Sequence, residues 1–153
     1  MRVPDPRFRR LASLVAIDAD ERVALLPCAD AGSPWTLPRC PVRARETYVE
    51  AAVRLADCCF ADRVVRWGAV LGRRWAPPPL GAPLVRVEEH LFLLRTDVSP
   101  TSPITARSPG TAARWAPRSR VDDLLREGYR DTTATLIDGY LGGWLPDGPI
   151  TLD

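Results

Sequence analysis

The segment from Thr47 to Phe60 constrains this chain most, because it fits only one kind of regular structure. It opens with the pattern T-x-x-E, Thr47 to Glu50, in which each side chain can accept a hydrogen bond from the other residue's backbone N–H. The residues that follow, YVEAAVRLADCCF, are mostly good helix formers. We therefore expect a helix starting at Thr47. We expect an irregular segment over residues 35–45, because Pro38 and Pro41 bar a regular element there.

Several other segments have the apolar patterns of β-strands. LASLVAID, the polar ADER and VALLPC predict two strands around a turn, a hairpin. VVRWGAVLGRRW predicts a strand with bends at Gly68 and Gly72. LVRVEEHLFLLR has a polar middle and an apolar end, which is typical of a central strand, and RWAP predicts a short strand.

The last third of the chain carries two further helical patterns. Ser119 is placed to cap RVDDLLRE, and Gly128 is placed to end it. Asp131 is placed to cap TTATLIDGYL, and Gly142 with Gly143 should end that helix. Strands and helices alternate without a regular βαβ rhythm, which predicts an α+β or mixed three-layer fold.

The length of 153 residues predicts one domain, residues 1–153, with a core of its own. Residues 96–113 are rich in Pro, Ser and Thr, and we expect a flexible loop or lid there. A net charge of only +2 argues against nucleic acid or an anionic membrane as partner. All 21 basic residues are arginines. Codon bias in a GC-rich genome and selection for binding phosphates or carboxylates both explain this, and the sequence does not separate them.

The four cysteines are Cys28, Cys40, Cys58 and Cys59, and their spacing contains no C-x-x-C pair. This is not a disulfide framework, so we expect reduced thiols and a cytoplasmic protein. No apolar run approaches the length of about 18–20 residues that spans a membrane, and we expect no signal peptide.

The order of these segments resembles that of the Nudix hydrolase family, over nearly the whole chain. The family's signature is G-x5-E-x7-R-E-U-x-E-E-x-G-U, where U is a bulky aliphatic residue. Glu46 and Arg54 match its first glutamate and its arginine at the required spacing. WTLP resembles the segment before the signature, EEHLFLL the family's E-x-F-F strand, and RWAPRSRVDDLL its RWW-x-x-x-E-L segment. The resemblance implies a Nudix-like α/β/α sandwich with a mixed β-sheet.

The departures from the signature fall in one region. Leu55, Cys58 and Cys59 stand at the three glutamates that bind metal in the family, and Arg39-Cys40-Pro41 replaces a glycine triplet. In the family, Mg²⁺ ions hold a diphosphate and activate water, and this hard cation prefers oxygen ligands to thiols. We therefore expect no cofactor and no Mg²⁺-dependent diphosphatase activity. The retained pair, Glu46 and Arg54, implies a structural brace between loop and helix.

Three consecutive ionisable residues, Glu88, Glu89 and His90, are the candidate acids and bases, because the resemblance places their strand beside the pocket. The alternative for His90 is a strand residue whose hydrogen bonds are satisfied within the structure. Asp57 points away from the former metal face and is expected to be a solvated helix charge.

Three hypotheses remain for the cysteines. The favoured one makes them small buried hydrophobic residues that pack with Leu55. The second is a nucleophilic thiol, with Cys59 as the weaker catalytic candidate, activated by Arg39 or His90. The third is a soft-metal site made by Cys40, Cys58 and Cys59, with His90 as an optional fourth ligand.

We expect a small-molecule ligand as the partner. Self-association into a homodimer is a further hypothesis. The candidate ligand-binding residues surround the loop and the helix: Trp35, Arg39, Cys40, Arg54, Leu55 and Cys58. Arg43 and Arg45 add positive charge to the same loop, or are solvated.

Three functions follow from these residues. The first is a metal-independent enzyme that acts on a small anionic or aromatic metabolite by isomerisation, cyclisation or hydrolysis, in specialised metabolism. The second is a catalytically dead binding or regulatory module. The third is a hydrolase with displaced carboxylates.

Overall fold

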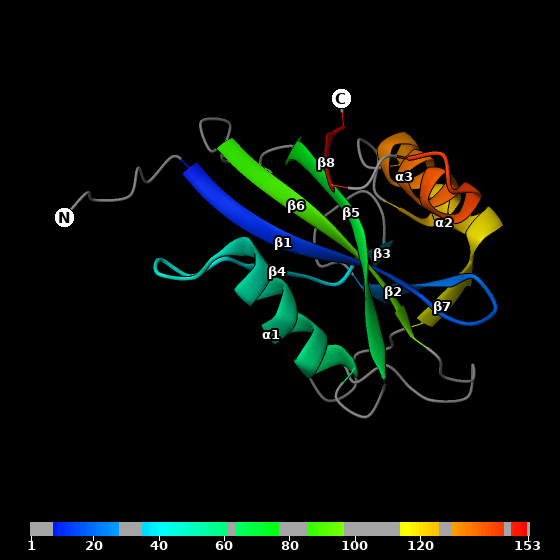
Figure 1. Cartoon of the computed structure of the whole chain (residues 1–153), viewed down its shortest axis with the longest axis horizontal. Coiled ribbons are helices and arrows are strands. Elements are labelled where there is room, and N and C mark those ends of the chain that lie inside the picture. The colour runs from blue at the N-terminus through cyan, green and yellow to red at the C-terminus, as the bar shows by residue number, and fades with distance from the viewer. Residues whose placement is uncertain are drawn as a thin grey trace.

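The computed structural model describes residues 8–27, 35–60, 64–76, 86–96, 114–125, 130–145 and 148–152. Over these ranges the chain forms strands and three helices around one sheet (Figure 1). The elements in chain order are β1 (Phe8–Ile17), β2 (Arg22–Pro27), β3 (Trp35–Thr36), β4 (Arg39–Pro41), α1 (Tyr48–Phe60), β5 (Val65–Ala76), β6 (Arg86–Thr96), β7 (Arg114–Pro117), α2 (Arg118–Leu124), α3 (Arg130–Gly142) and β8 (Gly148–Thr151).

The sheet is mixed, and its central strands come from distant parts of the chain. Its order is β3-β2-β1-β6-β5-β8, with β4 paired to β1 and β7 paired to β2. Strands β1 and β6 run parallel along their whole length, from Phe8 opposite Arg86 to Ile17 opposite Arg95. Strand β5 is antiparallel to β6, and β8 is parallel to β5. The predicted central position of β6 is thereby confirmed.

Helices cover both faces of the sheet: α1 lies on one face, and α2 and α3 lie on the other (Figure 1). Side chains alternate along β6, so Leu94 packs with α1 while Leu91 and Leu93 pack with Leu136 and Ile137 of α3. Two apolar layers result, one on each face of the sheet. This arrangement confirms the predicted α+β fold with three layers.

The hairpin between β1 and β2 is confirmed, and Asp18 explains its turn. Its buried carboxylate accepts hydrogen bonds from the backbone N–H groups of Asp20 and Arg22 and pairs with the Arg22 guanidinium at 2.9 Å. Glu21 completes the turn with a positive φ of 59°. A side chain that satisfies the turn's own backbone donors makes the reversal local.

Residues 35–45 are more regular than predicted. The short strand β4 pairs with β1 through Arg39 opposite Ser13 and Cys40 opposite Ala12. The prolines do not prevent this, because Pro41 is the last residue of the strand and Pro38 supplies its carbonyl to the Leu14 N–H at 2.8 Å. The expectation of an irregular segment was therefore wrong for Trp35–Thr36 and Arg39–Pro41.

The predicted start of α1 is confirmed at atomic level. The Thr47 N–H donates to the Glu50 carboxylate at 2.9 Å, and the Glu50 N–H donates to the Thr47 hydroxyl at 3.1 Å. Helix α1 begins at the next residue, Tyr48. This reciprocal pair satisfies two of the backbone donors that a helix start leaves unpaired.

The other two helix caps were predicted wrongly. Helix α2 begins at Arg118, directly after Pro117, without a side-chain cap, so Ser119 lies inside its first turn. Helix α3 begins at Arg130, so Asp131 is inside it. Its end was predicted correctly: α3 stops at Gly142, and Gly143 takes a φ of +70°.

The two glycines of β5 act differently. The pairing of β5 with β6 shifts register between Trp67 and Leu71, next to Gly68, which confirms an irregularity there. Gly72 stays in register, and a Cβ on it would lie 3.2 Å from Leu136 of α3. Its role is close packing of a helix on the strand rather than a bend.

Some predictions fall outside the described residues: Cys28, most of the expected lid at 96–113, and Gly128. Strand β8 was not predicted. None of the helices in the described part of the chain has the length and apolarity needed to cross a membrane.

Candidate functional site

The three consecutive ionisable residues of β6 do not form one group. Glu88 and His90 face the α1 side of the sheet, whereas Glu89 faces α3. The reason is the alternation of side chains along a strand, which sends neighbours to opposite faces. Of the three candidate acids and bases, Glu88 and His90 therefore share one side of the sheet, and Glu89 lies on the other.

On the α1 side, Tyr48, Glu88 and His90 form a compact polar cluster. The rings of Tyr48 and His90 stack, with centroids 3.5 Å apart and planes 8° from parallel. The Tyr48 hydroxyl donates to one Glu88 oxygen at 3.3 Å, and His90 Nε2 lies 3.3 Å from the other. One carboxylate thus orients both a phenol and an imidazole.

The environment fixes the protonation states of this cluster. Burial lowers the pKa of His90 from its ordinary value, against the opposing effect of Glu88, which favours the neutral imidazole at pH 7. Burial, together with the charge of Glu88, raises the pKa of the Tyr48 phenol, which stays protonated. A carboxylate only accepts hydrogen bonds, so the contact with Glu88 favours the tautomer in which His90 Nε2 carries the proton and Nδ1 holds a lone pair.

Two arginines border the cluster. Arg10 of β1 places its guanidinium 5.5 Å from the centre of the Tyr48 ring and is held by a 2.8 Å hydrogen bond to the Arg43 carbonyl. Arg73 of β5 lies directly opposite His90 in the strand pairing. Both positive charges act to lower the pKa of His90, and both would attract an anion.

Glu89 belongs to a different network on the α3 side. It accepts a hydrogen bond of 2.5 Å from the Ser13 hydroxyl and pairs with the Arg74 guanidinium at 2.7 Å. Arg74 also donates to the Thr133 hydroxyl of α3 at 3.0 Å. This network links four elements, β1, β5, β6 and α3, and we assign it to structure and leave Glu89 out of the candidate acid/base site.

The Glu46–Arg54 brace is present as expected. Arg54 donates two hydrogen bonds of 2.9 Å to the Glu46 carboxylate and a third, of 3.0 Å, to the Pro41 carbonyl. Arg54, and then the backbone N–H of Arg43, lower the pKa of Glu46 from 4.5 to about 2. The pair joins the loop after β4 to the middle of α1.

Two predicted ligand-binding residues lie elsewhere. Trp35 is half-buried, packs in the core layer on the α3 side, and has the Arg114 guanidinium 5.1 Å from its ring centre. Arg39 pairs with Ser13 in the sheet and so points to the face opposite Cys40. The structure therefore does not bring these two residues to the cluster of Tyr48, Glu88 and His90.

Sequence reasoning missed Tyr48, Arg10 and Arg73. The sequence indicates only that Tyr48 lies at the start of a helix, and no local pattern connects it with His90, 42 positions later. Only the parallel pairing of β1 with β6, with α1 packed over β1, brings them together.

Comparison with solved structures shows which known proteins have a similar fold. A Nudix hydrolase from Nitrosomonas europaea aligns over 94% of this chain and 78% of its own, with a TM-score of 0.62 and 15% identity. A MutT protein from Methanosarcina mazei aligns over 92% and 99%, with a TM-score of 0.64 and 14% identity. An Ap4A hydrolase from C. elegans aligns over 90% and 98%, with a TM-score of 0.65 and 12% identity.

The chain has the Nudix fold. No protein-family model and no curated protein matches its sequence. At these identities the likeness describes the backbone, so the chemistry must be judged from this chain's own side chains.

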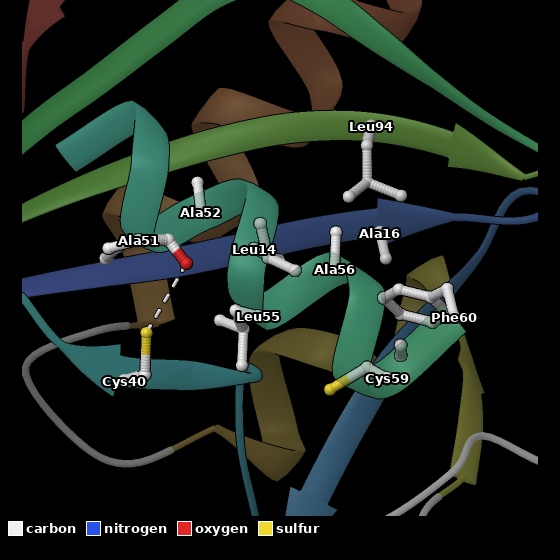
Figure 2. Packing of buried hydrophobic residues seen from close by; sticks show 12 residues of the cluster. Leu14, Ala16, Cys40, Ala51, Ala52, Leu55, Ala56, Cys59, Phe60 and Leu94 are labelled. Atoms are coloured by element: carbon white, nitrogen blue, oxygen red, sulfur yellow. Dashed lines mark hydrogen bonds between the residues drawn. The ribbon is translucent and has the colours of Figure 1, made fainter. Parts of the chain in front are cut away.

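The helix face that binds metal in the Nudix signature is part of the core in this chain. Leu55 and Cys59 are buried in the apolar layer between α1 and the sheet (Figure 2). Cys40 is buried beside them, its thiol directed to the Ala51 carbonyl at 3.6 Å. Cys58 alone of these four is exposed.

These residues do not fit Mg²⁺. Leu55 has no donor atom, and thiols are soft ligands that suit zinc or copper better. Among the described residues, no three His, Cys, Asp or Glu side chains are grouped so as to hold a metal ion. The soft-metal hypothesis for Cys40, Cys58, Cys59 and His90 is thereby left without a coordinating geometry. The burial of Cys40 and Cys59 favours their interpretation as small hydrophobic residues over that of nucleophiles.

Proposed function

We propose that this chain uses the Nudix fold for metal-independent acid/base chemistry on a small anionic or aromatic metabolite. The observation that carries the proposal is the cluster of Tyr48, Glu88 and His90. It combines a neutral imidazole, an oriented carboxylate and a protonated phenol on one face of the sheet. Enzymes use this combination to move protons.

His90 is the proposed general base. Its Nδ1 lone pair takes a proton from one atom of the substrate, and the imidazolium returns it to another atom, as an isomerisation or cyclisation requires. Glu88 accepts the hydrogen bond from Nε2, which fixes the tautomer and stabilises the positive charge that develops on the ring. Tyr48 packs flat against the ring and restricts its rotation.

The same proposal excludes Mg²⁺-dependent diphosphatase chemistry as the main activity. The two positions that would supply metal ligands from the inner face of α1, Leu55 and Cys59, are packed in the core. The Glu46–Arg54 pair remains and supports the helix without providing a nucleophile or a metal ligand.

The test is turnover of a bacterial metabolite extract in the presence of EDTA, followed by mass spectrometry. We expect the protein to consume at least one small metabolite, and Glu88→Gln and His90→Asn to reduce that consumption by about 10²-fold or more. Asp57→Asn is the matched control, because Asp57 is an exposed charge of α1. Turnover that persists in His90→Asn would contradict the proposal. Efficient Mg²⁺-dependent hydrolysis of ADP-ribose or a nucleoside triphosphate would also contradict it.

A second candidate function, a binding or regulatory module without catalysis, is favoured by one observation. The face of α1 that carries the metal ligands in the signature is filled with apolar packing rather than with new polar groups. In that case the protein would bind a metabolite reversibly, and both Glu88→Gln and wild type would leave the extract unchanged.

A further inference from the structure

The surface next to His90 and Glu88 carries an exposed aromatic ring flanked by arginines. Trp75 lies directly opposite Glu88, and Arg73 directly opposite His90, in the pairing of β5 with β6. Directly opposed residues of antiparallel strands point to the same face, with Cβ atoms about 4.5–5.5 Å apart. Trp75 and Arg73 therefore border the proposed base on the side toward β5.

Trp75 is not a core residue. It is 56% exposed, and one of its faces is covered by the guanidinium of Arg86, 4.5 Å from the ring centre. Helix α1 packs mainly on β1 and β4, on the far side of β6 from β5 (Figure 1). Because more than half of its surface is exposed, Trp75 offers a stacking surface to a planar ligand beside the polar cluster.

The charges around Trp75 are unbalanced. Arg10, Arg73 and Arg86 bring three positive charges to this face against the single negative charge of Glu88, while His90 is neutral. Neither Arg73 nor Arg86 forms an ion pair with another residue in the described part of the chain. Exposed guanidinium groups in this arrangement bind carboxylates through paired hydrogen bonds.

We infer that the ligand of this site is a planar aromatic carboxylate, which stacks on Trp75 and binds Arg73 and Arg86 through its carboxylate. This inference rests on the proposed function and names the substrate class of that site. Stacking on Trp75 places the ring of the ligand beside Glu88 and His90, since these are the cross-strand neighbours of Trp75 and Arg73. A proton on or next to the ring then lies near the proposed base.

The formal excess of two positive charges favours a carboxylate over a nucleoside triphosphate. A triphosphate carries up to four negative charges, which proteins usually balance with a divalent cation. The described residues do not fit such a cation, and Glu88 would repel a second group of negative charges. A carboxylate needs no metal and matches the flat fork of an arginine.

The test is calorimetric titration of the full chain, in EDTA, with three probes of related shape. 2-Naphthoate is planar and anionic, 2-naphthamide is planar and neutral, and cyclohexanecarboxylate is anionic without a ring for stacking. We expect 2-naphthoate to bind at least about tenfold more tightly than either of the others, because only this probe makes both contacts. His90 is the only histidine of the chain, so its imidazole NMR signals report whether the ligand lies beside it.

Two variants and two matched controls locate the site. Trp75→Leu and Arg73→Gln should each weaken 2-naphthoate binding by about tenfold. Trp144→Leu removes another highly exposed tryptophan, and Arg66→Gln removes an exposed arginine on the opposite face of β5; neither should change the affinity. Arg73 is exposed, so its variant tests the site even if Trp75→Leu disturbs the fold.

Each of the following results would overturn the inference: no binding of 2-naphthoate, equal binding of 2-naphthamide, or unchanged affinity in Arg73→Gln and Trp75→Leu. Tighter binding of AMP than of 2-naphthoate would assign the site to phosphates instead and would also overturn it. If 2-naphthoate fails to bind while His90-dependent turnover is found, the ligand class is wrong and the proposed function stands. If 2-naphthoate binds as expected but no His90-dependent turnover is found, the ligand class is right and the proposed function is wrong.

Discussion

The guanidinium of Arg74 and the carboxylate of Glu89 form an ion pair of 2.7 Å inside the protein, between the sheet and α3. The two side chains are only 5% and 2% exposed, and Ser13 and Thr133 supply further hydrogen bonds. Glu88 and His90, the neighbours of Glu89 in β6, lie on the opposite face of the sheet. The Arg74–Glu89 pair therefore holds β6 on the face away from the proposed site. Glu89, a candidate catalytic acid from the sequence, thus serves to hold β6, the strand that carries the proposed base His90.

Breaking this buried pair should be costly. Glu89→Gln leaves the Arg74 charge buried without its counter-charge, and we expect a loss of about 3–5 kcal/mol in the free energy of unfolding, measured by urea denaturation. The control is the exposed pair of Arg118 and Asp138, at 3.0 Å, where Asp138→Asn should change stability by less than about 1 kcal/mol. Equal effects of the two variants would show that Glu89 is not held in a buried pair.

The single histidine allows a direct measurement of the site's electrostatics. Burial lowers the pKa of His90 while Glu88 raises it and Arg73 lowers it, so NMR titration should give a pKa below the ordinary value of about 6.5. Glu88→Gln should lower that pKa further, and Arg73→Gln should raise it. The unfolded chain then takes up the proton first as pH falls below about 6.5, so this contribution to stability is present above that pH and is lost below it. A wild-type pKa above 7 would contradict the described environment.

The brace of Glu46 and Arg54 between loop and helix should make the stability of the protein depend on pH in the acid range. The pKa of Glu46 is lowered from 4.5 to about 2 by Arg54 and by the Arg43 N–H, so the folded protein keeps the carboxylate ionised where the unfolded chain does not. The stabilisation is therefore present above pH 4.5 and is lost as pH falls toward 2. We expect Glu46→Gln to be less stable than wild type at pH 7, with the difference shrinking between pH 5 and pH 2 in urea midpoints. A difference that is independent of pH would assign the effect to packing.

The two adjacent cysteines of α1 should differ strongly in how much the same substitution costs in stability. Cys59 is 5% exposed and lies in the apolar layer, so Cys59→Glu buries a carboxylate and should cost about 2–5 kcal/mol in unfolding free energy. Cys58 is exposed, so Cys58→Glu should stay within about 0.5 kcal/mol of wild type. If Cys59→Glu were as stable as wild type, that face would be open to solvent and a metal site would have to be reconsidered.

Thiol labelling gives an independent measure of the same packing. In a Cys28→Ser background, we expect one of the three remaining thiols, Cys58, to react rapidly with DTNB in the native protein, and Cys40 and Cys59 to react only on unfolding. Rapid reaction of two or three thiols would contradict their burial and would revive the nucleophile hypothesis.

Local features of the fold were predictable because their partners are close in sequence. The capping box of Thr47 and Glu50, the brace of Glu46 and Arg54, and the hairpin turn at Asp18 all join residues within eight positions. Prediction failed at Arg39–Pro41, where pairing with the distant strand β1 makes a three-residue strand out of a segment with two prolines.

The sequence by itself determined the scaffold and what is missing from it: the position of α1, the central strand β6, and the lack of oxygen ligands at Leu55, Cys58 and Cys59. Only the tertiary structure decided which residues meet. It separated Glu89 from Glu88 and His90, because a strand sends neighbours to opposite faces and α3 supplies Thr133 on one of them. It joined Tyr48 to His90, because α1 lies on the sheet beside the parallel pair β1 and β6. Contacts across such distances depend on packing, which no local pattern records.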